Sequence, residues 1–148
     1  MYSQNLVEDD ARIGEIVRSA KRVAVLGIRT AEESSQPAFY VPEYLQRHGI
    51  EIVPVPVYHP DAAEILGQKV YQRCADVPGP VDVLEVFRRP KDIEGHLDDM
   101  LKMKPRVVWF QLGIRNAKVA EALARAGILV VQDKCMKVEY ARHVKGRG

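Results

Sequence analysis

Arginine side chains follow two short apolar runs of the sequence, and their chemistry suits the binding of an anion. Arg29 follows the run that ends at Gly27, and Arg88 and Arg89 follow a run that ends at Phe87. Guanidinium groups pair well with phosphate oxygens, and an aromatic ring offers a flat apolar surface beside them. These residue types therefore favour a phosphorylated ligand with a flat or apolar portion.

The first apolar run, residues 23–26, has the sequence context of a phosphate-binding turn. It is continuous in apolar residues, as in a strand buried on both faces of a parallel sheet. Gly27 ends the run, and Ser35 and Pro37 suit the first positions of a helix. In an open α/β sheet, the free N–H groups at such a helix start face a phosphate. We therefore expect residues 27–30 to form the phosphate end of a nucleotide-cofactor site.

Prolines modify the two segments that come next. Pro42 would remove a hydrogen bond from a helix interior at a cost of about 3 kcal/mol, so we expect the regular helix to begin near Val41. A second strand is expected at 50–53. The prolines of segment 54–57 cannot donate ladder bonds, so we expect this segment to leave the sheet as an extended apolar ledge.

Five apolar runs alternate with helix-like segments, which is typical of an α/β fold. We predict a Rossmann-like, doubly wound, five-stranded parallel sheet in the order 3-2-1-4-5, with helices on both faces and a switch point between the first and fourth strands. Asp9 or Asp10 should cap a helix before the first strand, Pro90 should open another, and Asn116 should cap a third. The predicted strands are 23–26, 50–53, 81–87, 106–110 and 128–131.

Length and charge exclude several classes of protein. The 148 residues predict one domain over 1–148, with 1–8 and 143–148 flexible. A net charge of +2 is too balanced for a general nucleic-acid binder. No apolar run approaches a membrane span and the start does not resemble a signal peptide, so we expect a cytoplasmic protein without a membrane or nucleic-acid partner. Cys74 and Cys135 are too few for a disulfide framework.

The carboxyl ends of parallel strands meet at one edge of a sheet, so the residues that follow the five strands should lie together. A nicotinamide dinucleotide would need three glycines after the first strand and an acid after the second. Gly27 stands alone instead, and segment 56–59 contains no acid. The predicted edge consists of 27–30, 56–59, 87–89, 111–113 and 133–135, with three arginines, one lysine and one acid.

Six segments resemble a known family over most of the chain, from about Arg22 to Tyr140. They are Val-Ala-Val-Leu-Gly at 23–27, Val-Pro-Val at 55–57, Ile-Leu-Gly at 65–67, Val-Asp-Val-Leu-Glu-Val-Phe-Arg-Arg-Pro at 81–90, Val-Val-Trp-Phe-Gln-Leu-Gly-Ile at 107–114 and Val-Val-Gln-Asp-Lys-Cys at 130–135. They resemble the small stand-alone CoA-binding domain proteins, which are similar to the N-terminal domain of the succinyl-CoA synthetase α subunit.

This resemblance implies a coenzyme A site at the same edge of the sheet. By position, 27–30 would meet the pyrophosphate, and Val57 and Tyr58 would flank the adenosine or its phosphates. Phe87 and Arg88 would wall the nucleotide, while Gln111 and Gly113 would line the path of the pantetheine arm. The family has a pair of small residues where this chain has Ile28 and Arg29. The expected binding residues are Gly27, Ile28, Arg29, Thr30, Pro56, Val57, Tyr58, Phe87, Arg88, Gln111 and Gly113.

We expect a protein that binds CoA or acyl-CoA without catalysis of its own, in a regulatory, carrier or sensing role. Two alternatives stay open: a non-catalytic or partner-dependent subunit of an acyl-CoA enzyme, and an NAD(P)-binding redox sensor. No catalytic residue or metal site is expected, because His59 has no nucleophile or paired acid near it in sequence and the histidines lack metal-ligand spacing. Cys135 is either a redox-active thiol at the cleft or an inert buried one. A homodimer or an unknown protein partner also stays open.

Overall fold

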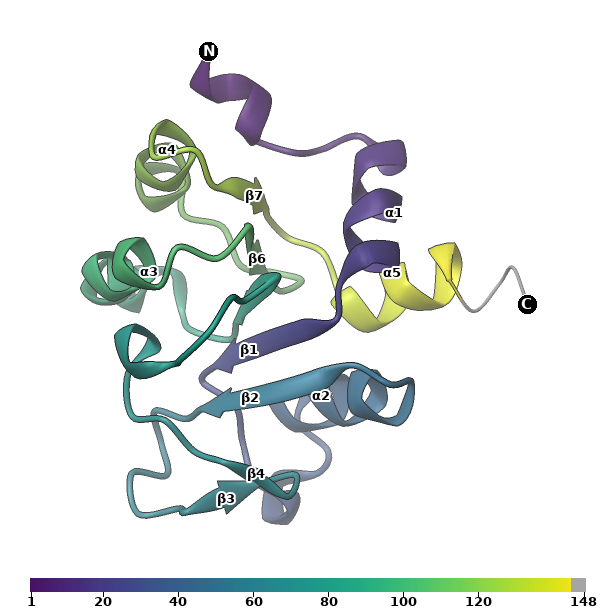
Figure 1. Cartoon of the computed structure of the whole chain (residues 1–148), viewed down its shortest axis with the longest axis vertical. Coiled ribbons are helices and arrows are strands. Elements are labelled where there is room, and N and C mark those ends of the chain that lie inside the picture. Colours follow the sequence, from purple (N-terminus) through teal and green to yellow (C-terminus); the bar gives the residue numbers. More distant parts are fainter. Residues whose placement is uncertain (145–148) are drawn as a thin grey trace.

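A computed structural model of the chain describes residues 1–144, in which a parallel sheet lies between two layers of helices (Figure 1). The five strands follow the spatial order β2-β1-β5-β6-β7, and every neighbouring pair is parallel. A two-stranded antiparallel hairpin, β3-β4, contacts β2. The strand bounds are Arg22–Leu26 (β1), Glu51–Val55 (β2), Glu64–Ile65 (β3), Gln68–Lys69 (β4), Val83–Val86 (β5), Val107–Phe110 (β6) and Leu129–Val131 (β7).

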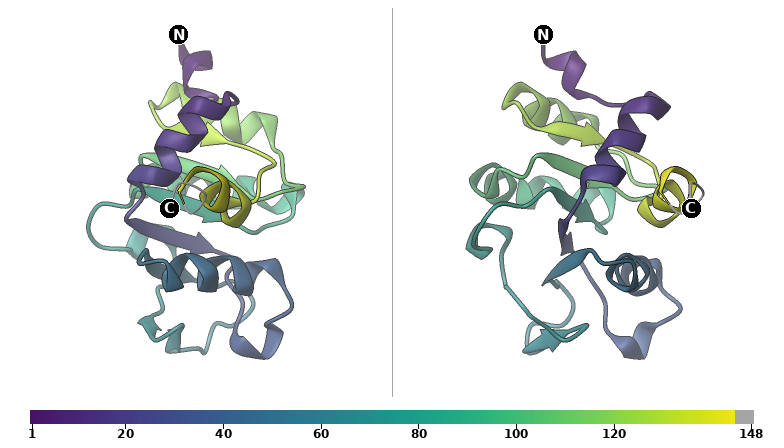
Figure 2. Two further views of the ribbon diagram at one scale, coloured as in Figure 1. Left: turned by 90° about the vertical axis from the view of Figure 1, so that its right-hand side faces the viewer. Right: turned by 45° about the vertical axis from the view of Figure 1, so that its right-hand side comes forward.

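Three helices cover one face of the sheet and two cover the other. Figure 2 shows α1, α2 and α5 in front of the sheet in its left view, while α3 and α4 lie behind it. The α-helices are Asp10–Ser19 (α1), Pro37–Arg47 (α2), Leu97–Met103 (α3), Ala117–Arg125 (α4) and Met136–His143 (α5). Short 3-10 helices are Tyr2–Asn5 (η1), Ala31–Glu33 (η2), Cys74–Asp76 (η3), Pro90–Asp92 (η4) and Glu94–His96 (η5).

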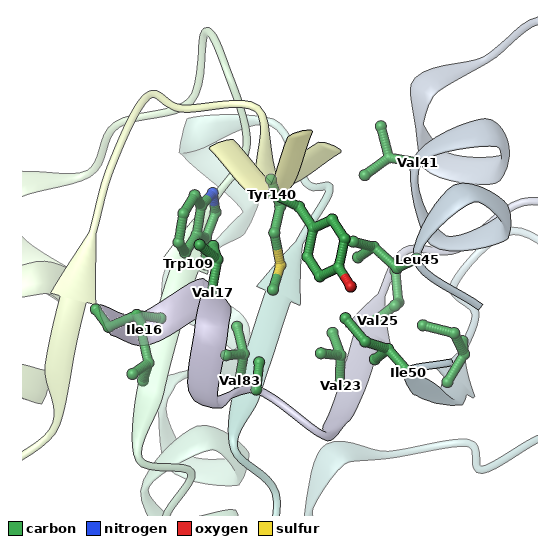
Figure 3. Close-up of a cluster of buried hydrophobic side chains, with 14 of the residues drawn as sticks. Ile16, Val17, Val23, Val25, Val41, Leu45, Ile50, Val83, Trp109 and Tyr140 are labelled. Carbon is green, nitrogen blue, oxygen red and sulfur yellow. The ribbon is translucent and has the colours of Figure 1, made fainter. Parts of the chain in front are cut away.

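Side chains along each strand alternate between two apolar cores. Val23 and Val25 of β1 join the core beneath α1, α2 and α5, which also contains Trp109 (Figure 3). Ala24 and Leu26 point the other way, into the core beneath α3 and α4. Because both faces are buried, β1 is continuous in apolar residues from Val23 to Leu26, as the sequence predicted.

Several sequence predictions of local structure are confirmed. Asp9 caps α1 by accepting a hydrogen bond from the Arg12 N–H at 3.1 Å. Asn116 caps α4 by accepting one from the Val119 N–H at 2.9 Å. The segment that Pro90 opens differs from the expected single helix, since η4 and η5 precede α3. Among the described residues, no helix is long and apolar enough to cross a membrane.

The α/β class, the five parallel strands and the helices on both faces are confirmed, but the predicted strand order 3-2-1-4-5 is wrong. In chain order the sheet is 2-1-3-4-5, because β5 pairs with β1 instead of β2. Pro54 explains why β2 takes the edge. Its carbonyl accepts the Tyr71 N–H at 3.0 Å on the outer side of β2, and its nitrogen faces the same way, so β1 loses no ladder bond. The switch point therefore lies between β1 and β5, not between the first and fourth strands.

The N-terminal segment 1–8, which was expected to be flexible, is ordered against the other edge of the sheet. The Val7 N–H donates to the Val130 carbonyl at 2.8 Å, and the Val7 side chain is buried. This contact covers an edge strand that would otherwise expose unpaired backbone groups. Of the expected flexible tail 143–148, His143 belongs to α5, and residues 145–148 lie outside the described part of the chain.

Glu85 is a buried carboxyl group in the central strand β5. Its side chain is 0% exposed, and neither of its carboxyl oxygens has a hydrogen-bond partner. In the strand register it lies between Val25 of β1 and Trp109 of β6, which both belong to an apolar core. Burial raises the pKa of Glu85 from 4.5 to about 8, so the group is mostly protonated at neutral pH.

The protein should therefore lose stability as the pH rises toward 8. In the unfolded chain Glu85 ionises near its ordinary pKa of 4.5, so above that pH the folded state holds the extra proton. The free energy of unfolding should then fall by up to about 1.4 kcal/mol per pH unit until the folded pKa is reached. In Glu85→Gln this slope should disappear from urea unfolding measured between about pH 5 and pH 8. Glu15→Gln, which changes an exposed residue of α1, should keep the slope. A wild-type slope in Glu85→Gln would contradict the assignment.

Candidate functional site

An open cleft of about 340 Å³ lies at the carboxyl edge of the sheet, beside the β1/β5 switch point. This volume is at the lower end of the range for ligand pockets, about 300–1,000 Å³. The loops after β1, β2, β5 and β6 and the start of α2 contribute to its wall. The lining residues are Arg29, Gln36, Pro37, Ala38, Tyr58, Phe87, Arg88, Arg89, Pro90, Gln111, Leu112 and Ile114.

The structure brings some of the sequence-predicted residues into this cleft and leaves others outside its wall. Arg29, Tyr58, Phe87, Arg88 and Gln111 line it. The other predicted residues lie nearby and have structural roles. In the loop after β1, Gly27 permits a close contact, Ile28 is buried in the core beneath α1, α2 and α5, and Thr30 caps η2. After β2, Pro56 is buried and Val57 packs against the core beneath α3 and α4, and after β6 the Gly113 N–H donates to Asp133 at 2.7 Å.

Gly27 permits a close approach between the loops after β1 and β5. Its φ angle is +86°, and an added Cβ would lie 2.3 Å from the carbonyl oxygen of Phe87. The Gly27 N–H donates to Val55 at 2.8 Å, and the Phe87 N–H donates to Leu26 at 2.9 Å. The ends of β2, β1 and β5 are thus held together at a point that only glycine can occupy.

The start of α2 corrects the expectation that the helix begins near Val41. The helix begins at Pro37 and continues through Pro42. Proline has no N–H, so Pro42 leaves the carbonyl of Ala38 free of its usual helical partner. That carbonyl accepts the Arg29 N–H at 3.1 Å instead. Pro42 therefore allows α2 to bind the backbone of a cleft residue.

Tyr58 connects the two main cations of the cleft. The Arg29 guanidinium lies 3.9 Å from the centre of the Tyr58 ring, and that of Arg88 lies 5.5 Å from it. Arg88 also donates to the Tyr58 hydroxyl at 2.9 Å. Cation–π attraction and this hydrogen bond order three side chains from three different loops.

His96 holds the other side of the Arg88 guanidinium, a role that sequence reasoning missed. Arg88 Nε donates to His96 Nε2 at 3.2 Å, which requires a neutral imidazole. Burial and the nearby Arg88 charge lower the pKa of His96, with Asp99 and Asp92 opposing them. The sequence offered no indication of this contact, because it depends on the turn η5.

Glu33 and His59 form a second network that the sequence did not indicate. Arg29 Nη1 lies 2.7 Å from Glu33 Oε2, and His59 Nε2 lies 2.5 Å from Glu33 Oε1. Glu33 also forms a capping box with Thr30 at the start of η2. Burial opposes ionisation, but hydrogen bonds from His59 and Arg29 hold the pKa of Glu33 below its ordinary value. This loop carboxylate thus lies between a guanidinium group and an imidazole.

The remaining thiols and acidic groups lie outside the wall of the cleft. Burial raises the pKa of the Cys74 thiol to about 12, which leaves it unreactive at neutral pH. Cys135 precedes the first residue of α5 and packs against a core.

Within residues 1–144, Asp10, Glu139 and His143 have the spacing of metal ligands. The Arg142 guanidinium already bonds both of these carboxylates, at 3.0 and 2.7 Å, so it neutralises part of their charge without a metal ion.

The close approach at Gly27 can be tested against a second glycine of similar conformation. Gly113 has a φ angle of +85° but no atom within 4 Å of an added Cβ. Gly113→Ala should therefore cost only backbone strain, about 1–2 kcal/mol of unfolding free energy. Gly27→Ala should cost at least about 1 kcal/mol more, because overpacking is added. Urea unfolding of both variants measures the difference, and equal losses would show that the contact with Phe87 is unimportant.

The fold and the cleft define a class of protein, a doubly wound α/β protein with a basic cleft at its switch point. Residues 21–141 match the family model of the CoA binding domain, and the chain belongs to this family. The resemblance inferred from the six sequence segments is thereby confirmed.

One curated relative and two solved structures are similar to this chain. The chain is 33% identical over 131 residues to YneT of Bacillus subtilis (strain 168), covering 88% of this chain and 93% of YneT. The solved structure of cell-free ID.343 from Thermus thermophilus has a TM-score of 0.85 and 38% identity, covering 92% of this chain and 99% of that chain. The apo dinucleotide-forming acetyl-coenzyme A synthetase 1 of Ca. Korarchaeum cryptofilum shares the fold, with a TM-score of 0.58 at 24% identity, over 74% of this chain and 25% of that chain.

Proposed function

We propose that this chain binds coenzyme A or an acyl-CoA in the cleft beside β1 and β5. The observation that supports this most directly is the grouping of Arg29 and Arg88 around the ring of Tyr58. CoA joins phosphates to a flat adenine ring and an apolar arm, and these residues match its charged and flat parts. Membership in the CoA binding domain family supports the same ligand class.

The residues of the cleft suit the three parts of such a ligand. Arg88 and Arg89 would hold phosphates, and Tyr58 and Phe87 would contact the base. Leu112 and Ile114 would contact the apolar arm, since they extend the lining on the β6 side. The cleft is open, so the ligand would keep part of its surface in water.

The composition of the lining supports binding instead of catalysis. Its twelve described residues include no serine, threonine, cysteine, histidine, lysine or acid. Covalent catalysis and general acid–base catalysis depend mainly on these residue types and on tyrosine, and the hydroxyl of Tyr58 already accepts a hydrogen bond from Arg88. Two histidines lie outside this lining, and both are already engaged, His59 by Glu33 and His96 by Arg88. A carrier, sensing or regulatory role for CoA therefore fits the cleft better than turnover by this chain alone.

Loss of the Arg88 charge should weaken CoA binding. Isothermal titration of Arg88→Gln should give at least about tenfold lower affinity, because charge-assisted hydrogen bonds contribute more than neutral ones. Arg125→Gln is the matched control, since Arg125 ends α4 and is not part of the cleft lining. Equal affinities of the two variants would remove Arg88 from the site.

Ligand comparison separates the proposed function from its alternatives. Wild-type protein should bind CoA and acetyl-CoA more tightly than NAD⁺ or NADH, and dephospho-CoA shows what the 3′-phosphate contributes. Tighter binding of NAD⁺ or NADH would favour a dinucleotide site. Absence of CoA binding at millimolar concentration would exclude the proposed function.

A further inference from the structure

Two donor groups in the loops after β1 and β2 converge on one anion. Arg29 Nη1 and His59 Nε2 lie 2.7 and 2.5 Å from different oxygens of the Glu33 carboxylate. The three side chains are 27–29% exposed, so each is partly shielded from water. This geometry is that of an anion subsite, and an acid of the same chain fills it.

The subsite is continuous with the cleft. Arg29 lines the cleft and stacks on Tyr58, which directly precedes His59 in the chain. A phosphate group accepts hydrogen bonds from the same donors as a carboxylate, and it has more acceptor oxygens and a higher negative charge. A phosphorylated ligand in the cleft would therefore compete with Glu33 for Arg29 and His59.

We propose that Arg29 and His59 form a phosphate subsite that Glu33 occupies in the free protein, and that a phosphate of the bound ligand displaces Glu33. This inference deepens the proposed function and rests on it. Glu33 keeps the two donors together without a ligand, and it lowers the affinity of the site for anions. Binding then separates Glu33 from the loop after β2, so that the segment η2 responds to the ligand.

Glu33→Gln is the variant that tests this competition. Glutamine keeps the shape of the side chain and can form the same capping box with Thr30, but it lacks the charge. Glu32→Gln is the matched control. Glu32 is the next residue, it is exposed, and within residues 1–144 its side chain makes no hydrogen bond to Arg29 or His59. Both variants change the net charge equally, so a difference between them reports the contact itself.

Calorimetric titration should be performed with CoA and separately with inorganic pyrophosphate, at low ionic strength. Glu33→Gln should bind both about three- to tenfold more tightly than Glu32→Gln, as expected for the loss of a partly exposed competing ion pair. The double variant Glu33→Gln/His59→Gln should lose the gain, since one donor of the subsite is missing. Salt should reduce the difference between the single variants.

The two ligands separate failure of this inference from failure of the proposed function. Equal or weaker binding of both ligands by Glu33→Gln would overturn the inference, and Glu33 would instead be a residue that positions Arg29. Wild-type binding of CoA would leave the proposed function intact in that case. Absence of CoA binding in every variant would exclude the proposed function, and the pyrophosphate titration would still decide whether the subsite exists. Thermal unfolding checks that each variant is folded at the titration temperature.

Discussion

The contact between the Gly27 backbone and the Phe87 carbonyl is the constraint on which the cleft depends. An added Cβ at residue 27 would lie 2.3 Å from that oxygen, so the ends of β1 and β5 can meet this closely only at a glycine. Beyond this contact, the loops after β1 and β5 separate on the two sides of the switch point. Arg29 follows two residues after Gly27, and Arg88 follows one residue after Phe87. Both side chains consequently reach the same ring, that of Tyr58.

The two arginines differ in how their charge is balanced before any ligand arrives. Arg29 pairs with the carboxylate of Glu33 at 2.7 Å. Arg88 bonds to a neutral imidazole, His96, and to the hydroxyl of Tyr58, so its charge stays available to an anion. Orientation by uncharged acceptors preserves the attraction of a cation for phosphate, whereas pairing with an acid competes with it. In the proposed function, the affinity of the cleft for an anion would depend on Arg88 and on how readily the anion replaces Glu33 at Arg29.

Two prolines show how a local rule can hold while the inference drawn from it fails. Pro54 was correctly expected to be incompatible with a central strand, and β2 lies at the edge of the sheet, not between two strands as predicted. The expectation that segment 54–57 leaves the sheet is wrong for its first half, because Pro54 and Val55 end β2 and pair with Val25 and Leu26. Pro42 does leave a helical carbonyl without its usual partner, but the helix does not start later. The carbonyl of Ala38 bonds to the Arg29 N–H, so a contact with another loop compensates for the missing bond.

Sequence alone established the α/β class, the approximate strands, the caps at Asp9 and Asn116, and the meeting of cations at one edge of the sheet. These features depend on apolar periodicity, turn chemistry and the common direction of parallel strands, which extend over a few residues or follow from the fold class. Strand order and the partners of each cation were settled by the folded chain. Glu33 and His59 are 26 positions apart, and they meet because β1 and β2 are neighbours whose loops turn toward each other. Contacts of this kind depend on the path of the loops through space, and local sequence patterns carry no information about that path.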